Sequence, residues 1–321
     1  MKSMSFGVHL PITGFRKKTQ IREKIISFAK TAEDLGYELI NVHDHFVDSS
    51  ATPATTWLDP LIALAMASAV TNRIMLGTSV LNIVLRNPVH CAQALASIDT
   101  LSSGRLLAAG VGPGSRNDDF DLCGVPFGER WGRFVKALCF LRLILNGEQT
   151  VPSNESYKYY GSKKVVVGFK PFQNRYLPIM IGSWGTSHAA LKRVAKYGDG
   201  WIASALTVTP EQFKERWDMI LDYRRSFGLD TDSFKNSLVT VLGYIDDDHE
   251  KVKNLVAKLS SPVPGMSRED LCRSLLFGSR EQSYQRVKAF YENGVQSLCF
   301  WPIQNYSNQI ELFTKEILRY F

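Results

Sequence analysis

Apolar runs of strand length alternate along the chain with longer segments in which apolar residues recur every three or four positions. Eight such runs can be distinguished, each short enough to be a single strand. They cover residues 6–12, 39–46, 74–81, 106–112, 178–184, 200–206, 238–245 and 297–303. Helical spacing follows over residues 22–37, 88–102, 187–198, 209–228 and 279–294. The nearly continuous apolar character of the runs predicts parallel strands with both faces of the sheet covered.

Eight strand–helix units predict an α/β fold, a TIM (β/α)8 barrel, with a doubly wound open sheet as the alternative. Two connections are longer than one helix requires: residues 115–177 after the fourth strand and residues 246–282 before the eighth. Insertions of this kind lie over the carboxyl end of a barrel and shape its pocket. We therefore expect a single barrel domain over residues 1–321.

Composition and charge narrow the class of protein. With 321 residues and 45% hydrophobic content the chain can bury a large core. Its longest apolar run, residues 58–70, contains Pro60 and falls short of the ~20 residues of a membrane span. The N-terminus has no apolar signal region, so we expect a cytoplasmic protein. The net charge of +7 is scattered, which favours anionic small molecules over nucleic acid.

Three polar residues, His43, Asp44 and His45, end the second predicted strand. Such groups are costly to bury without partners, so they form either a functional cluster or loop residues bonded to their neighbours. The His-x-His spacing also suits a metal hydrolase. That reading is disfavoured because the later strand ends offer neither His nor Asp, and the five cysteines lack CxxC spacing. We predict no metal.

The third predicted strand is interrupted by Gly77, Thr78 and Ser79, where buried packing favours Val or Ile. Small residues at a strand end let the backbone approach a flat ligand directly. A β-bulge with glycine at a tight corner explains them equally well.

Two glycine-rich turns follow the fourth and fifth strands. Gly112, Pro113, Gly114 and Ser115 continue a G-x-G-x-G string that matches a dinucleotide loop only weakly, because Pro113 removes a backbone N–H. A flexible turn is the alternative. The second turn, which opens a helix, can cradle a phosphate, or it can be ordinary N-capping by Thr186 or Ser187. It comprises Gly182, Ser183, Trp184, Gly185 and Thr186.

Several blocks in order resemble the luciferase-like flavin or deazaflavin oxidoreductases, which are related to bacterial luciferase. They include AEDLGYELINVHDHF, RIMLGTSVLNIVLRNPVHCAQALASIDTLSSGRLLAAGVGPG, PIMIGSWG and YENGVQSLCFWP, and together span nearly the whole chain. Within the family, GTSVLNIVLRNP resembles most closely the branch that uses the deazaflavin coenzyme F-420. The resemblance implies the TIM-barrel fold and often a homodimer.

The resemblance also implies roles for particular residues. It places a non-prolyl cis peptide between Ser79 and Val80, in a bulge that backs the deazaflavin ring. It puts Asp44 and His45 beside the reactive carbon, with His45 as proton donor or acceptor and Asp44 orienting it or bonding the ring. The loops at 112–115 and 182–186 hold the ribityl chain and phosphate. Ser115 stands where the sugar-phosphate dehydrogenases of the branch keep an acidic residue, so their substrate does not carry over.

The sequence thus predicts a coenzyme F-420-dependent oxidoreductase that transfers hydride between C5 of the deazaflavin and a small organic substrate. The alternative is a luciferase-like monooxygenase that uses reduced FMN. A barrel that binds flavin without turnover is a third reading, disfavoured by the titratable cluster at residues 43–45.

Overall fold

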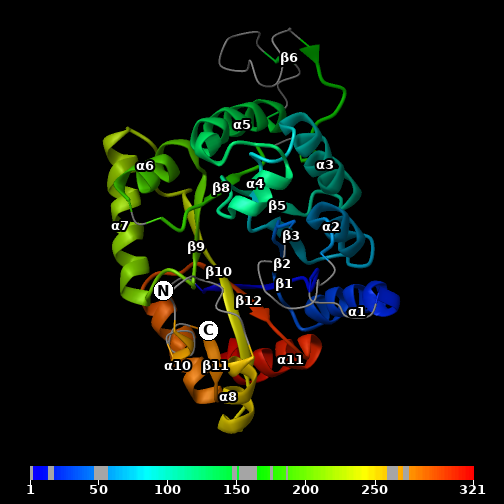
Figure 1. Cartoon of the computed structure of the whole chain (residues 1–321), viewed down its shortest axis with the longest axis vertical. Helices are drawn as coiled ribbons and strands as arrows, with labels where there is room; N and C mark the ends of the chain where they lie inside the picture. Colours follow the sequence, from blue (N-terminus) through cyan, green and yellow to red (C-terminus); the bar gives the residue numbers. More distant parts are fainter. Residues whose placement is uncertain are drawn as a thin grey trace.

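Eight parallel strands close into a barrel in the computed structural model (Figure 1). The structure describes residues 3–13, 18–46, 57–146, 150–151, 165–173, 176–185, 187–258, 267–269 and 275–321. The barrel strands are β1 (Ser5–His9), β2 (Leu39–Val42), β3 (Met75–Thr78), β5 (Leu106–Gly112), β8 (Ile179–Gly182), β9 (Gly200–Ser204), β10 (Lys235–Ile245) and β12 (Ser297–Pro302). Pairing of β9 with β10 closes the ring, so the TIM barrel is confirmed and the open sheet is wrong.

Helices cover the outside of the barrel (Figure 1). They are α1 (Ile21–Asp34), α2 (Pro60–Ser68), α3 (Pro88–Leu101), α4 (Asn117–Leu122), α5 (Arg130–Leu145), α6 (His188–Tyr197), α7 (Pro210–Ser226), α8 (His249–Ala257), α10 (Arg280–Glu292) and α11 (Tyr306–Glu316). Short 3-10 turns, η1 (Lys18–Gln20), η2 (Phe127–Glu129) and η4 (Leu318–Tyr320), accompany them. Thr209 and Ser279 begin α7 and α10 with complete capping boxes.

Alternate residues of each strand face the helices and form the core. Trp201 of β9 is fully buried, and its ring stacks 5.0 Å from Phe213 of α7. In β12, Phe300 stacks 4.6 Å from Phe313 of α11. The other residues of the strands face the barrel interior, and this alternation decides which side chains reach each end of the barrel.

The two predicted insertions contain additional elements. After β5 come α4, η2, α5 and a two-stranded antiparallel pair, β6 (Thr150–Val151) with β7 (Val165–Val166). Before β12 come α8 and β11 (Leu276–Gly278), which pairs with the far end of β10 outside the ring. A short strand, β4 (Leu81–Asn82), pairs with β5 directly after the bulge.

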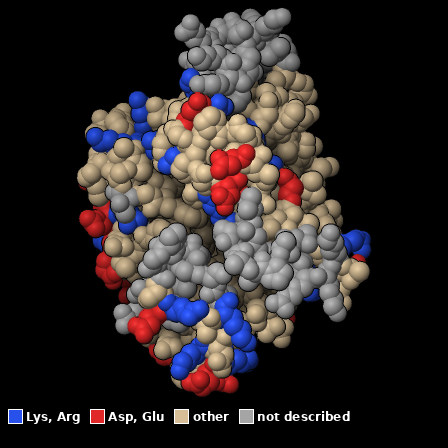
Figure 2. All heavy atoms as spheres, viewed as in Figure 1, with Lys and Arg blue, Asp and Glu red and all other residues tan. Residues whose placement is uncertain are grey.

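Charged side chains of both signs are interspersed over the face shown in Figure 2. That distribution agrees with the scattered lysines and arginines of the sequence. In the described part of the chain, no helix combines the length and the apolar character needed to span a membrane.

Candidate active site

Aromatic and imidazole rings gather where β1, β2 and β12 end. His9 is the last residue of β1, His43 follows β2, and Trp301 lies near the end of β12. The Trp301 ring centroid is 4.3 Å from that of His9 and 4.2 Å from that of His43. Trp57 meets His43 edge-on at 5.4 Å. These four rings form one wall of the carboxyl-end mouth of the barrel.

The two buried imidazoles in this wall are held neutral. Burial lowers the pKa of His9 from 6.5 to about 3. Burial, and then the neighbouring His9, His45 and Arg116, lower the pKa of His43 well below its ordinary value. At neutral pH the wall therefore presents uncharged rings, suited to a planar ligand.

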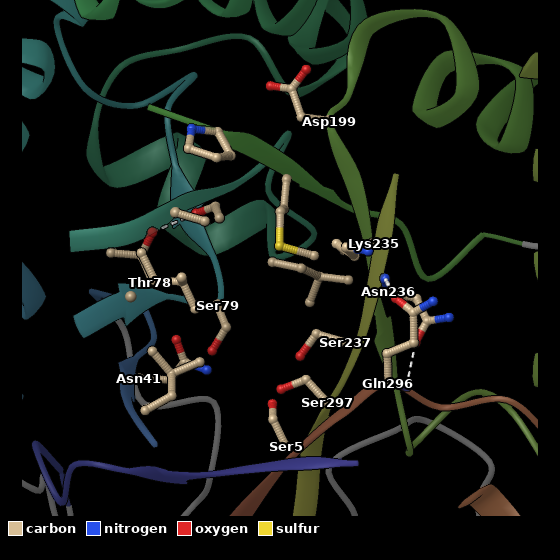
Figure 3. A pocket seen from close by; sticks show the side chains of 18 of the residues that line it. Ser5, Asn41, Thr78, Ser79, Asp199, Lys235, Asn236, Ser237, Gln296 and Ser297 are labelled. Carbon is tan, nitrogen blue, oxygen red and sulfur yellow. Dashed lines mark hydrogen bonds between the residues drawn. The ribbon is translucent and has the colours of Figure 1, made fainter. Parts of the chain in front are cut away.

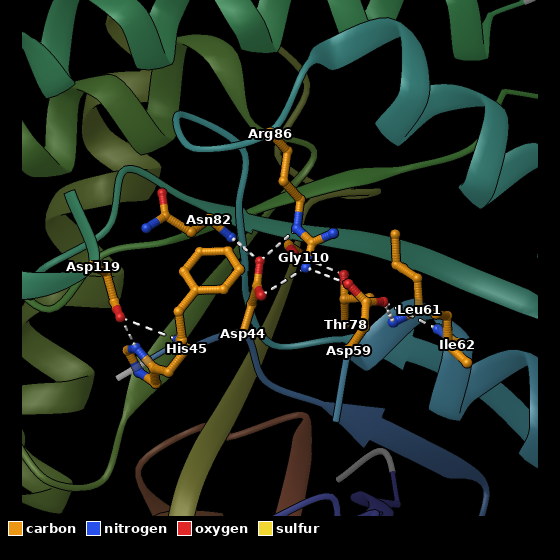
Figure 4. Close-up of polar contacts among 11 residues, drawn as sticks. Asp44, His45, Asp59, Leu61, Ile62, Thr78, Asn82, Arg86, Gly110 and Asp119 are labelled. Atoms are coloured by element: carbon orange, nitrogen blue, oxygen red, sulfur yellow. Dashed lines mark hydrogen bonds and ion pairs between the residues drawn. The ribbon is translucent and has the colours of Figure 1, made fainter. Parts of the chain in front are cut away.

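His45 lies beside this wall and is held by a buried carboxylate (Figure 4). Its Nδ1 atom is 3.0 Å from Oδ2 of Asp119, whose Oδ1 accepts a 3.1 Å hydrogen bond from the backbone N–H of Phe46. The Asp119 side chain is 1% exposed and that of His45 20%. Because an ionised carboxylate only accepts, Nδ1 carries the hydrogen. Nε2 is the nitrogen left to exchange a proton with a ligand.

Asp44 is engaged elsewhere. Nε and Nη2 of Arg86 donate to its two carboxylate oxygens, each at 2.8 Å, and the backbone N–H of Asn82 adds a 3.1 Å bond. Arg86 Nη2 also lies 2.9 Å from Asp59, which caps α2. Burial by itself lowers the pKa of Arg86, but its bonds to Asp44 and then to Asp59 outweigh burial and raise the pKa above its ordinary value. The guanidinium therefore stays charged. Asp44 thus ties together the loops around the mouth.

The contact that would orient His45 comes from Asp119 and not from Asp44, while a bond from Asp44 to the cofactor ring stays a prediction. Both oxygens of Asp44 are already bonded by Arg86, and its side chain is 0% exposed. The physical reason is the turn after β2, which sends Asp44 toward β4 and α2 while His45 faces α4. A catalytic part for His45 stays a prediction.

The third strand ends in the bulge that the resemblance implied. The Ser79–Val80 peptide bond is cis, as predicted. The Val80 side chain lies between two strands: a Cβ on Gly112 would be 2.7 Å from one Val80 methyl group, and a Cβ on Gly182 2.6 Å from the other. A Cβ on Gly110 would collide with the Thr78 carbonyl oxygen. The bulge reading of residues 77–79 is thus confirmed, and the close approach of a flat ligand to them stays a prediction.

The remaining predicted cofactor residues line the rim. Pro113 is half-buried, and Ser115 is exposed. Gly114 has φ +80°, and a Cβ there would lie 2.3 Å from Asn82 Nδ2, so only glycine fits.

Beyond β8, Ser183 and Trp184 are half-buried and Gly185 is exposed. Thr186 lies outside the described residues. Ser187 caps α6 by accepting from the Ala190 N–H at 3.3 Å, so the N-cap reading holds for Ser187. A phosphate at this turn stays a prediction.

Buried polar atoms without hydrogen-bond partners among the described residues concentrate at the mouth. Those at the mouth are Nδ1 of His9, both ring nitrogens of His43, Nε1 of Trp57 and Oδ1 of Asn82. Buried polar groups in folded proteins nearly always have partners, so a ligand with polar ring edges fits this place. The sequence analysis did not single out His9, Arg86, Asp119 or Trp301, although Arg86 and Trp301 lie within the blocks GTSVLNIVLRNP and YENGVQSLCFWP that carry the family resemblance.

Comparison with known proteins identifies the class. The family model described as luciferase-like monooxygenase matches residues 4–296. The chain therefore belongs to the luciferase-like monooxygenase family, the class of enzyme that the sequence predicted.

Among curated relatives, it is 34% identical over 190 residues to the F-420-dependent glucose-6-phosphate dehydrogenase of Kineococcus radiotolerans, covering 57% of this chain and 52% of that protein. The chain spans only 52% to 66% of the length of the curated relatives that it matches.

Solved structures share the whole fold. An F-420-dependent secondary alcohol dehydrogenase superposes with a TM-score of 0.83 at 17% identity, covering 98% of both chains. The oxygenating constituent of 3,6-diketocamphane monooxygenase from Pseudomonas putida, in complex with FMN, gives a TM-score of 0.75 at 14% identity, covering 99% of both chains. These likenesses establish the fold.

Proposed function

We propose that the protein is a coenzyme F-420-dependent oxidoreductase whose deazaflavin binds across the carboxyl-end mouth of the barrel. The observation that carries this proposal is the cluster of unpartnered buried polar atoms on His9, His43, Trp57 and Asn82, directly beside His45. When bound, the deazaflavin supplies or accepts a hydride at C5. The relative that acts with F-420 on a sugar phosphate supports the choice of cofactor.

The chain contributes position and proton handling. Val80 forms the floor of the mouth against which a ring rests, and the paired glycines at 112 and 182 keep that floor in place. The neutral rings of His9, His43 and Trp301 form the side wall. His45 gives or takes the substrate proton at Nε2, because its Nδ1–H is fixed by Asp119.

The loops at the rim are assigned to the tail of the cofactor. Residues 112–115 at the end of β5 and 182–185 at the end of β8 stand at the carboxyl ends of neighbouring strands. Ser115 and Gly185 are small and exposed there, which leaves space for a ribityl chain and phosphate, as at other barrel phosphate sites. The substrate is a small organic molecule held over the ring.

Equilibrium binding of the purified protein to oxidised F-420 and, separately, to FMN tests the proposal by fluorescence titration at matched salt. Tight binding of F-420 with weak binding of FMN is the expected result. His45→Asn should keep that affinity and lose turnover by about 10²–10⁴-fold in a survey of alcohols and aldehydes. Preference for FMN would overturn the proposal and favour the reduced-FMN monooxygenase, with oxygen consumption as the next assay.

A further inference from the structure

The opposite end of the barrel holds a separate cavity of about 390 Å³ (Figure 3). Its position follows from the strands: Ser5, Lys235 and Ser297 are the first residues of β1, β10 and β12. Pro178 and Asp199, just before β8 and β9, also line it. The cavity therefore opens at the amino ends of the strands, away from the mouth with His45.

Small side chains create this space. The interior of a TIM barrel is ordinarily filled by layers of bulky branched residues. Here the lining residues from five different strands are small: Ser5, Gly77, Ala108, Ser237 and Ser297. The volume lies within the range of about 300–1,000 Å³ that small-molecule pockets occupy.

Apolar side chains lie between most of the cavity and the mouth, while on the β3 side Ser79 lines the cavity and its Oγ lies 3.3 Å from Nε2 of His9. Ile202, Val239 and Cys299 pack together inside the barrel, with Val80 and Met180 against them. Val239 and Cys299 each follow a cavity serine by two positions on the same strand. A molecule in the cavity therefore lies under these apolar side chains, while the proposed cofactor lies above them.

Hydroxyl groups without partners face the cavity. Oγ of Ser237 and Oγ of Ser297 are buried and have no hydrogen-bond partner among the described residues. Ser237 is only 6% exposed. In Figure 3 the side chains of Ser5, Ser237 and Ser297 point into the same space, opposite Asn41 and Ser79. Buried hydroxyls left unpaired cost free energy, and a ligand that bonds both removes that cost.

The charged groups at the rim already have partners. Arg224 donates to the carbonyls of Ala195 and Gly198 at 2.9 and 3.0 Å. Asp199 accepts from Arg142 at 3.1 Å, and Lys235 donates to the Asp232 carbonyl at 3.3 Å. Inside the cavity, one side presents hydroxyl groups. The apolar residues that line the cavity include Leu39, Met180 and Ile202.

We propose that this cavity is a second ligand site, which binds an uncharged molecule of monosaccharide size. Its ligand carries neighbouring hydroxyl groups along one edge, which bond Ser237 and Ser297, and an apolar face that packs against Met180 and Ile202. Serine hydroxyls both donate and accept, so they match the hydroxyls of a neutral polyol. The groups that would bond the ligand's hydroxyl edge, Ser237 and Ser297, are uncharged, and the Asp199 carboxylate at the rim is already paired with Arg142.

Saturation-transfer NMR with trans-cyclohexane-1,2-diol as the probe tests the site on the full chain without cofactor. Saturation transfer to the diol is expected with the unaltered protein. Ser237→Ala and Ser297→Ala should each weaken the probe's affinity roughly fivefold, the effect of one lost hydrogen bond. Ser283→Ala is the matched control, because the Ser283 hydroxyl on α10 is also buried and has no hydrogen-bond partner in the described part of the chain, but Ser283 does not line the cavity.

Each outcome decides the proposal. Retained affinity in Ser283→Ala with losses in the two cavity variants supports it, as does undiminished transfer when excess F-420 or FMN is added. No transfer to the diol would show that the cavity holds only water and overturn it. Equal affinity in all variants, or displacement of the diol by either cofactor, would place the probe outside the cavity and would also overturn the proposal. Because the probe is measured without cofactor, failure of the proposed function leaves this test intact.

Discussion

Nδ1 of His45 lies 3.0 Å from Oδ2 of Asp119, although the two residues are 74 positions apart. The carboxylate reaches the mouth from α4, inside the insertion after β5. The insertion thus does more than cover the barrel, because it supplies the group that fixes the tautomer of the proposed proton-transfer residue. In the loop before this helix, Ser115 stands where the sugar-phosphate dehydrogenases of the family keep an acidic residue. Asp119, four positions later, brings a carboxylate to the mouth.

Asp119→Asn is expected to lower turnover about a hundredfold or more while cofactor affinity stays unchanged. The amide can donate to Nδ1, which favours the tautomer with hydrogen on Nε2, and it no longer stabilises the charged imidazolium. Nitrogen-15 NMR of the His45 ring reports the tautomer directly, and a pH profile of turnover reports the altered proton affinity. Asp121→Asn is the control, because Asp121 is exposed on the same helix and bonds Asn117. A normal tautomer and pH profile in Asp119→Asn would refute the positioning role.

Arg86→Met is expected to reduce the free energy of unfolding by about 3–5 kcal/mol. The substitution keeps much of the side-chain volume but leaves Asp44, whose side chain is 0% exposed, without its charged partner. Urea denaturation measures the change. Lys214→Met removes an exposed pair with Asp218 on α7 and should cost about 0.5 kcal/mol. Equal losses in the two variants would mean that the buried network contributes no more than a surface pair.

The sequence predicted the barrel well because a local run of apolar residues marks the position of each strand along the chain. The run at 106–112 coincides with β5, and those at 178–184, 200–206 and 297–303 each contain an observed strand. The start of β10 was missed by three residues, since Lys235, Asn236 and Ser237 are polar where they line or border the amino-end cavity. Polar residues that line the cavity thus hide the start of this strand.

The sequence predicted a feature of the candidate site only where a single segment contains all the residues that define that feature. The 43–45 cluster and the Ser79–Val80 bond each lie in a single stretch, and the latter came from family resemblance. The partners came from elsewhere: Asp119 from a six-residue helix, and Arg86 from the turn before α3. Pairing between distant segments depends on how loops fold over the barrel, which periodicity does not specify.

The pH dependence of stability should reveal the neutral state of His9. Its pKa is lowered by burial to about 3 in the folded protein, against 6.5 for the ordinary side chain. Between these values the unfolded chain binds more protons, so the free energy of unfolding falls as pH falls. The contribution is fully present above the unfolded pKa, and one group adds a slope of up to about 1.4 kcal/mol per pH unit.

His9→Phe removes this titration while keeping a ring beside Trp301, which stacks 4.3 Å from His9. The slope of unfolding free energy between about pH 4 and pH 6 should then fall by up to about 1.4 kcal/mol per unit. Urea denaturation at several pH values measures it. A slope equal to that of the unaltered protein would show that His9 takes up a proton in the folded state.

Contact between Val80 and Gly182 offers a test of the mouth floor that does not require a known substrate. A Cβ at residue 182 would lie 2.6 Å from a Val80 methyl group, closer than real Cβ contacts, so Gly182→Ala must displace the Val80 side chain or one of the two strands. We expect F-420 affinity to fall about tenfold and stability by about 1–3 kcal/mol, the cost typical of overpacking. Fluorescence titration and urea denaturation measure the two effects.

The double variant Gly182→Ala with Val80→Ala separates a crowded floor from other damage. Shortening Val80 removes the methyl groups that the new Cβ would strike, so stability should recover relative to the sum of the single changes, giving a positive coupling in a double-mutant cycle. Cofactor affinity should recover less, because the ring loses the valine surface on which it rests. Gly128→Ala is the control, since a Cβ there meets nothing within 4 Å. Additive losses in the cycle would mean that Gly182 is required for a reason other than the space occupied by Val80, and full affinity in Gly182→Ala would place the cofactor away from this floor.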